Sequence, residues 1–277
     1  MLFKRFATVL LLSALALKGD LLDDKIINLI GQDNYNLHKN LVDEIRNDKS
    51  ALLANKNINF HHLLKTLKEK TLLNTSLSEQ TEITVIFTVV NSNKKGFKIL
   101  QDVLSNIGYA YYFTDFIKNV DGNLVWQIHF KSDFALDPYS LSTELSQFQT
   151  SIIDINKIST TQWEYTINLQ EGILYDVKSV PLDEKLTLPM PLEPYILSLP
   201  NVKELLIVSE KGNNWIPKIS FYDKELNALG TIEMDGVYEA IKVSIPKNTQ
   251  YAKISDRYTL LNLKRGLSIL VSNPLKN

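Results

Sequence analysis

The spacing of apolar residues changes twice along the 277-residue chain, and each change marks a segment that folds differently. Residues 20–78 carry apolar side chains at helical spacing, as at Leu37, Leu41 and Ile45. This spacing predicts a small helical domain over 20–78, whose helices of roughly ten residues persist only by packing on a neighbour. The polar stretch Ser76–Gln80 (SLSEQ) that follows is typical of a linker.

Residues 81–170 predict an α+β domain with the order β-α-β-β-α-β. Ile83–Val90 (ITVIFTVV) is β-branched and nearly continuous, which is typical of a strand buried on both faces. Asp121–Gly122 favours a tight hairpin turn between two strands, and Asp137–Pro138 has the cap and first-turn residues of a second helix. The order is that of the ferredoxin-like split βαβ fold. The extra stretch Ile153–Ser159 either lengthens the last strand or adds a hairpin.

Proline and short β-prone runs mark the last part of the chain. Eight of the nine prolines lie after position 180, and five of these fall within Pro181–Pro200. Because proline fixes φ and has no N–H group, the sequence predicts a stiff connector over 171–200; an edge segment over Pro181–Pro200 is the alternative. Residues 201–277 hold short β-prone runs at roughly ten-residue spacing, which favours an antiparallel, jelly-roll-like β-sandwich domain. The expected fold class is therefore multi-domain α+β.

The N-terminus has the layout of a signal peptide. Lys4 and Arg5 precede the apolar run Ala7–Leu17 (ATVLLLSALAL), which is too short to cross a bilayer. Small residues at Ala14 and Ala16 stand where signal peptidase reads the chain, so we expect residues 1–16 to be removed; an uncleaved anchor is the alternative. No membrane span is expected after cleavage, and the expected location is the periplasm or the medium.

Composition excludes several classes of protein. The chain has 30 Lys+Arg against 31 Asp+Glu, and this balance excludes a strongly basic nucleic-acid-binding protein. The absence of cysteine excludes disulfides, thiol catalysis and zinc–thiolate or iron–sulfur sites. No phosphate-binding loop, nucleophile elbow or zinc-protease motif occurs, so neither an enzyme nor a cofactor is expected. A metal site at His61–His62 and a hydrolase built on paired carboxylates are the minor alternatives.

Two groups of aromatic residues are the candidate binding residues. Five rings lie near strand ends or turns of the last domain: Trp215, Tyr222, Tyr238, Tyr251 and Tyr258. Such rings stack on the apolar faces of sugars, although core filling is the alternative, and Trp215 is the ring to test first. Four more candidates lie in the aromatic segment 109–116 (YAYYFTDF): Tyr109, Tyr111, Tyr112 and Phe113. This segment is a candidate edge that takes up a partner strand, the alternative being packing on a neighbouring domain.

The segment Trp215–Asn227 (WIPKISFYDKELN) combines a strand of the type P-x-I-x-F-Y-D with a short turn. Together with the exportable N-terminus, it is similar to multi-domain periplasmic or secreted proteins of the Helicobacter and Campylobacter group. Such groups include envelope and flagellar-motor accessory factors, so the resemblance implies an interaction role. The expected function is a non-enzymatic adaptor that binds other envelope proteins. The alternative is a carbohydrate- or peptidoglycan-binding protein that holds cell-wall glycans through the C-terminal aromatic residues.

Overall fold

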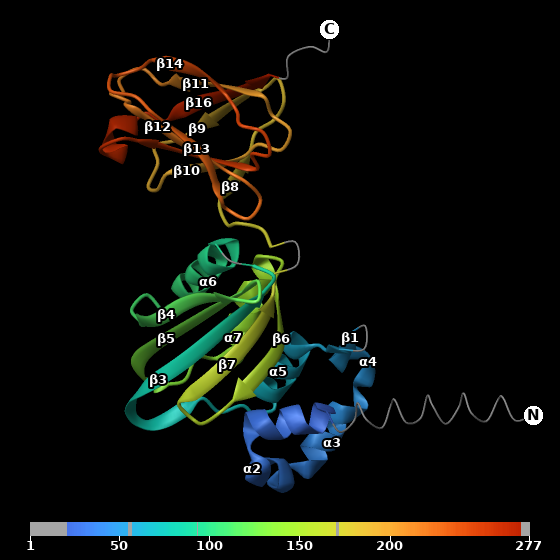
Figure 1. Ribbon diagram of the computed structural model, residues 1–277. Helices are drawn as coiled ribbons and strands as arrows, with labels where there is room; N and C mark the ends of the chain where they lie inside the picture. Colours follow the sequence, from blue (N-terminus) through green and yellow to red (C-terminus); the bar gives the residue numbers. More distant parts are fainter. Residues whose placement is uncertain (1–20, 55–56, 93, 170–171, 273–277) are drawn as a thin grey trace, which may run out of the picture. The chain divides into compact units, whose positions relative to one another are not determined.

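The computed structural model describes residues 21–54, 57–92, 94–169 and 172–272 (Figure 1). The chain is a mixed α/β protein that divides into two compact units, Met1–Ile173 and Leu174–Asn277. The predicted signal peptide, residues 1–16, lies outside the described residues. Within the described ranges, no helix has both the length and the apolar character needed to cross a membrane.

The first unit begins with the helices that the sequence predicts. Helical residues 21–30 are followed by these elements: α2 (Gln32–Leu37), α3 (Lys39–Asn47), α4 (Lys49–Leu52), β1 (Leu53–Ala54), β2 (Asn57–Ile58) and α5 (Phe60–Glu69). The longer helices bury one apolar stripe each, for example Ile45 in α3 and Leu67 in α5. The predicted stripe from Leu37 to Ile45 is interrupted because α2 ends before His38, which leaves Leu37 exposed.

The segment Ser76–Gln80 is not a linker, and this prediction is wrong. It forms the first part of β3 (Ser76–Val90), which pairs with β5 (Asn123–Phe134) as far as Ser76 opposite Phe134. The ladder is irregular between Ser76 and Thr81, so this part of β3 is an exposed, bulged strand end whose far residue, Ser76, is paired again. The helical segment and the sheet accordingly belong to one compact unit instead of two domains.

The sheet of the first unit has the strand order β4-β5-β3-β7-β6. Its remaining elements are α6 (Lys94–Asn106), β4 (Phe113–Val120), α7 (Pro138–Gln147), β6 (Ser151–Lys157) and β7 (Gln162–Asn168). The predicted order holds through α7, after which the stretch Ile153–Ser159 adds a hairpin, so that β7 lies parallel beside β3 and β6 forms the edge.

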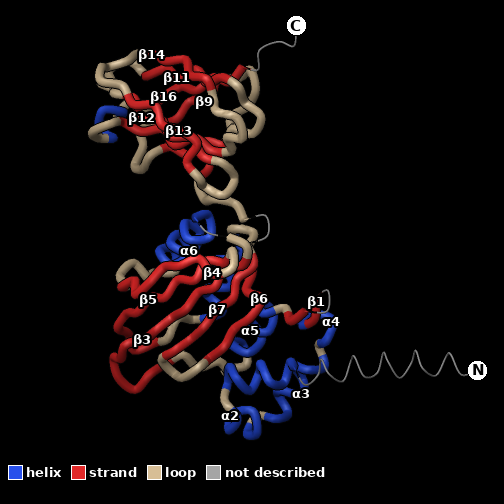
Figure 2. The backbone as a smooth tube through the Cα atoms, in the orientation of Figure 1, coloured by secondary structure: helices blue, strands red, loops and turns tan. Residues whose placement is uncertain are grey.

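Burial of β3 alternates along the strand. Ile83, Val85 and Phe87 are buried, whereas their neighbours are only half-buried, so the expectation of a strand buried on both faces is wrong. Helices α5, α6 and α7 cover the face with the buried residues (Figure 2). On that face Trp126 of β5 meets Phe97 of α6, with ring centroids 4.9 Å apart.

The second unit consists of two sheets, ordered β13-β12-β15-β10-β8 and β14-β11-β16-β9. Its elements are β8 (Val177–Ser179), β9 (Lys185–Leu188), β10 (Tyr195–Ser198), β11 (Glu204–Ser209), β12 (Pro217–Tyr222), β13 (Ala228–Glu233), β14 (Ala240–Ser244), β15 (Tyr251–Asp256), η1 (Leu260–Leu263) and β16 (Leu267–Ser272). Neighbouring strands are antiparallel except for β8 and β10. Residues of both sheets share one hydrophobic core, with Ile207, Phe221 and Ile269 among its members.

The segment 171–200 is not a connector, because β8, β9 and β10 all lie in it and pair into the two sheets; β9 is an edge strand, as the alternative expects. Its prolines stand between the strands: Pro181 follows β8, Pro189 follows β9 and Pro200 follows β10. Proline at these positions removes no ladder hydrogen bond and stiffens the turns. The proline-rich segment therefore forms part of the second unit.

Gly266 gives a prediction about the stability of the second unit. It has φ +82°, and a Cβ there would lie 1.9 Å from the carbonyl oxygen of Leu188. Gly212 is the matched control, because its φ is +97° and its nearest neighbour, Cγ of Arg265, would lie 3.8 Å away. We expect Gly212→Ala to cost about 1–2 kcal/mol and Gly266→Ala about 3 kcal/mol more, measured by urea unfolding. Equal losses would contradict the close approach.

Candidate functional site

One edge of the sheet in the first unit is capped from within the chain. The Nδ2 group of Asn28 donates to the carbonyl oxygen of Lys157 at 3.2 Å, and the N–H of Lys157 donates to Oδ1 of Asn28 at 2.8 Å. Lys25 adds a hydrogen bond of 3.1 Å to the carbonyl oxygen of Ile155 and an ion pair of 2.5 Å with Asp154. Helical residues 21–30 therefore satisfy backbone groups at the outer side of β6 that another strand would otherwise pair with.

The opposite edge, β4, has no strand beside it among the described residues. Its apolar side chains are exposed: Phe113 is 71% exposed and Ile117 is 46% exposed. Tyr111, in the loop just before the strand, is 93% exposed. An unpaired edge with exposed apolar side chains is a template for pairing with another chain.

The four predicted edge residues divide into two fixed rings and two exposed ones. Tyr109 packs on Phe130 with ring centroids 5.0 Å apart, and Tyr112 packs on Trp126 at 5.4 Å. Burial raises the pKa of both tyrosines. Tyr109 and Tyr112 therefore anchor the entry to β4, whereas Tyr111 and Phe113 remain largely exposed.

A small polar cluster fixes the start of β4. The ladder with β5 is irregular between Thr114 and Phe116, where the Asp115 carboxylate accepts hydrogen bonds from Gln127 at 2.9 Å and from His129 at 2.7 Å. The hydrogen bond from Gln127 lowers the pKa of Asp115, partial burial opposes it, and the contact with His129 lowers it further. Phe113 stacks on the His129 ring with centroids 5.2 Å apart. These contacts hold β4 in a defined register.

The five predicted C-terminal aromatic residues do not form one platform. Trp215 is fully buried in the shared core, and its indole N–H donates to the carbonyl oxygen of Ser255 at 3.0 Å, so it does not stack on a ligand. Tyr251 is only 8% exposed, and burial raises its pKa. Tyr238 is partly exposed in the turn after β13. Only Tyr222 and Tyr258 line the same cleft.

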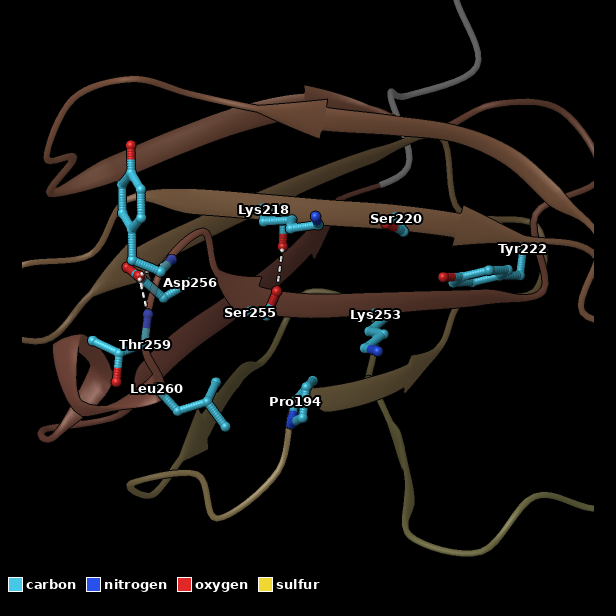
Figure 3. Close-up of a pocket in the computed structure, with 10 residues that line it drawn as sticks. Pro194, Lys218, Ser220, Tyr222, Lys253, Ser255, Asp256, Thr259 and Leu260 are labelled. Carbon is cyan, nitrogen blue, oxygen red and sulfur yellow. Dashed lines mark hydrogen bonds between the residues drawn. The ribbon is translucent and has the colours of Figure 1, made fainter. Parts of the chain in front are cut away.

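This cleft lies on the outer face of the sheet that contains β12 and β15 (Figure 3). Because side chains alternate along a strand, Lys218 and Ser220 of β12 point outward, and so do Lys253 and Ser255 of β15. Ser255 opposes Lys218 in the ladder, and Lys253 opposes Ser220. The four side chains form a polar floor, which sequence reasoning missed because it considered aromatic residues only.

Asp256 holds the loop that forms one wall of the cleft. Its Oδ1 atom accepts hydrogen bonds from the backbone N–H groups of Tyr258 and Thr259, at 2.8 and 3.0 Å, and from the side chain of Asn262 at 3.0 Å. Its Oδ2 atom accepts from the N–H of Ile216 at 2.7 Å. The carboxylate is buried and bonded on both oxygens, so it positions Tyr258.

Other polar groups outside the two sites act in local structure. Nδ1 of His61 lies 3.0 Å from Oγ of Ser142, and Nε2 of His62 lies 3.1 Å from Asp48. Across the described ranges, no three His, Asp or Glu side chains gather as metal ligands. Asp223 accepts hydrogen bonds from the backbone of its own turn at Glu225 and Asn227.

In comparisons with known proteins, no family model and no curated protein matches the sequence.

Asp256 gives the second prediction. We expect Asp256→Ala to lower the free energy of unfolding of the second unit by about 2–4 kcal/mol, because it leaves buried N–H groups without an acceptor. The control is Asp235→Ala at an exposed turn, with an expected change within about 0.5 kcal/mol. Urea unfolding gives the stabilities, and hydrogen exchange at residues 256–263 locates the change. Equal effects of the two substitutions would show that Asp256 does not anchor the loop.

Proposed function

We propose that this protein is a non-enzymatic adaptor of the bacterial envelope that binds other envelope proteins by taking up a strand along β4. The observation that carries the proposal is the asymmetry of the sheet in the first unit. Among the described residues, the β6 edge is capped by Asn28 and Lys25, whereas the β4 edge has no partner. A strand added at β4 forms main-chain hydrogen bonds, and side chains at alternate positions provide specificity.

The side chains of β4 support uptake of a strand. Proteins usually protect an edge with charges, prolines or bulges. β4 has one lysine, Lys118, and one irregularity, but it also exposes Phe113, Ile117 and Val120. A partner strand would cover these apolar groups and would leave Lys118 at the rim, where charges set specificity.

The topology supports finer fold assignments. In the first unit β5 lies between β3 and β4, which are joined through α6, as in the first half of the ferredoxin-like split βαβ fold. The last strand departs from that fold, because β7 lies parallel to β3 and the hairpin strand β6 is added outside it. In the second unit eight successive strands, β9 to β16, are divided between two sheets that share a core. We infer that the second unit is a jelly-roll-like β-sandwich with β8 added beside β10.

The location of the adaptor rests on the signal-peptide pattern of residues 1–16. We infer export to the periplasm or the medium, where the chain meets other envelope proteins. The absence of cysteine is compatible with an oxidising compartment.

A matched pair of substitutions tests the strand-uptake proposal. Ile117 in β4 and Ile153 in β6 are equally exposed, at 46%, and lie on opposite edges of one sheet. With a photo-cross-linker at Tyr111 in living cells, we expect a discrete product with an envelope protein. Ile117→Lys is expected to reduce this product at least about tenfold, because a charge on the edge opposes strand pairing, and Ile153→Lys to leave it unchanged.

Hydrogen exchange of the purified complex is the second readout. The amides of Phe113–Val120 are expected to gain protection when the partner binds, because their outer side becomes paired. The proposal fails if the cross-link survives Ile117→Lys, if both substitutions act equally, or if protection appears elsewhere in the sheet.

A further inference from the structure

The cleft in the second unit has the parts of a small-molecule site that the strand-uptake proposal does not use. Its volume is about 260 Å³, just below the ~300–1,000 Å³ range of ligand sites, so it suits a single sugar-sized ring. The polar floor of Lys218, Ser220, Lys253 and Ser255 is rigid because it stands on two paired strands.

Aromatic rings stand at the sides of this floor. Tyr222 is half-buried at the end of β12, and Figure 3 shows it at the opposite end of the cleft from Thr259. Tyr258, 70% exposed, belongs to the loop that Asp256 holds. Rings held in this way offer an apolar face at low entropic cost, as stacking on a sugar requires.

The charges of the cleft distinguish between possible ligands. Lys218 is neutralised by Glu233, with Nζ 2.7 Å from Oε1. Lys253 has no ion-pair partner among the residues that the structure describes. The only carboxylate that lines the cleft, Asp256, is already bonded: it accepts three hydrogen bonds from its own loop and one from the N–H of Ile216. The cleft therefore presents one unpaired ammonium group to a ligand.

We propose that this cleft binds a saccharide that carries a carboxylate. A sugar ring stacks on Tyr222, its carboxylate pairs with Lys253, and its hydroxyl groups bond to Ser220 and Ser255 on the floor. Both serines are only 9% exposed, and their hydroxyls already bond within the sheet: Oγ of Ser255 donates to the carbonyl oxygen of Lys218 at 3.3 Å, and Oγ of Ser220 lies 3.1 Å from Oγ1 of Thr231. Their oxygens are therefore held in place to accept hydrogen bonds from sugar hydroxyl groups. The site is independent of β4, so either proposal stands without the other.

The test titrates the full chain with paired acidic and neutral sugars: glucuronate against glucose, and N-acetylmuramate against N-acetylglucosamine. Binding is followed by calorimetry and by NMR shifts of the cleft amides. We expect an acidic sugar to bind at least about tenfold more tightly than its neutral partner. Failure of both acidic sugars to bind at millimolar concentration would overturn the proposal.

Variants separate the two contacts. Lys253→Met is expected to abolish the preference for the acidic sugar, while Lys264→Met, a lysine outside the cleft, leaves it unchanged. Tyr222→Ala is expected to weaken both sugars about tenfold, and Tyr238→Ala to weaken neither. Tyr222→Leu, with an unfolding curve for each variant, separates a loss of stacking from a loss of folding.

Three results would overturn the assignment. Equal effects of Lys253→Met and Lys264→Met would show general charge attraction. Binding that survives both Tyr222→Ala and Tyr222→Leu would remove the stacking platform. Acetate that competes for the cleft with the same affinity as glucuronate would show a simple anion site that does not recognise sugar.

Discussion

The backbone N–H and C=O groups at the two edges of the five-stranded sheet are the constraint on which the first unit depends. At β6 the amide of Asn28 supplies both the acceptor and the donor that Lys157 would otherwise find in a further strand. The same helical residues bury Ile26 and Leu29, so capping the edge and completing the core are one event. This explains why the helices and the sheet form one unit, and it leaves β4 as the edge that has no further strand beside it among the described residues.

Local signals in the sequence predicted local structure well. Asp121 and Gly122 both have positive φ in the turn between β4 and β5. Asp137 caps α7 by accepting from the N–H of Tyr139, with Pro138 in the first turn. Each of these features depends only on residues a few positions apart, so composition and spacing were sufficient.

The errors in the sequence-based fold arose where a partner distant in sequence decides the structure. Ser76–Gln80 is mostly polar, yet it belongs to β3, whose first residue, Ser76, pairs with Phe134 of β5 more than forty residues later. The proline-rich segment has the composition of a connector, yet its strands pair with β15 and β16 at the far end of the chain. The hairpin of β6 and β7 was one of two open alternatives, because the sequence alone did not locate its turn.

The candidate sites were only partly predictable for a related reason. The edge segment was found because consecutive aromatic residues are visible in sequence, but which rings are fixed depends on Phe130 and Trp126. In the second unit the burial of a ring depends on which side of its strand faces the other sheet. Trp215 lies in the core, whereas Tyr222 points to the outer face of the sheet, like Lys218 and Ser220, which stand at alternate positions of the same strand. The sequence analysis did not find the lysines and serines of the floor, because they come together only when β12 and β15 pair and turn them to the same face.

The two proposed contacts suit one molecule because they make different physical demands. Strand uptake at β4 relies on main-chain hydrogen bonds and exposed apolar side chains, so it selects a protein with a free strand. The cleft relies on a ring and an unpaired ammonium group, so it selects a small charged sugar. Each unit has its own core and its own proposed binding site. A mutation that weakens one site is therefore expected to leave the other unit folded. An adaptor that joins a protein to a glycan requires that separation, since each affinity is then set independently, and simultaneous engagement strengthens the attachment beyond either contact alone.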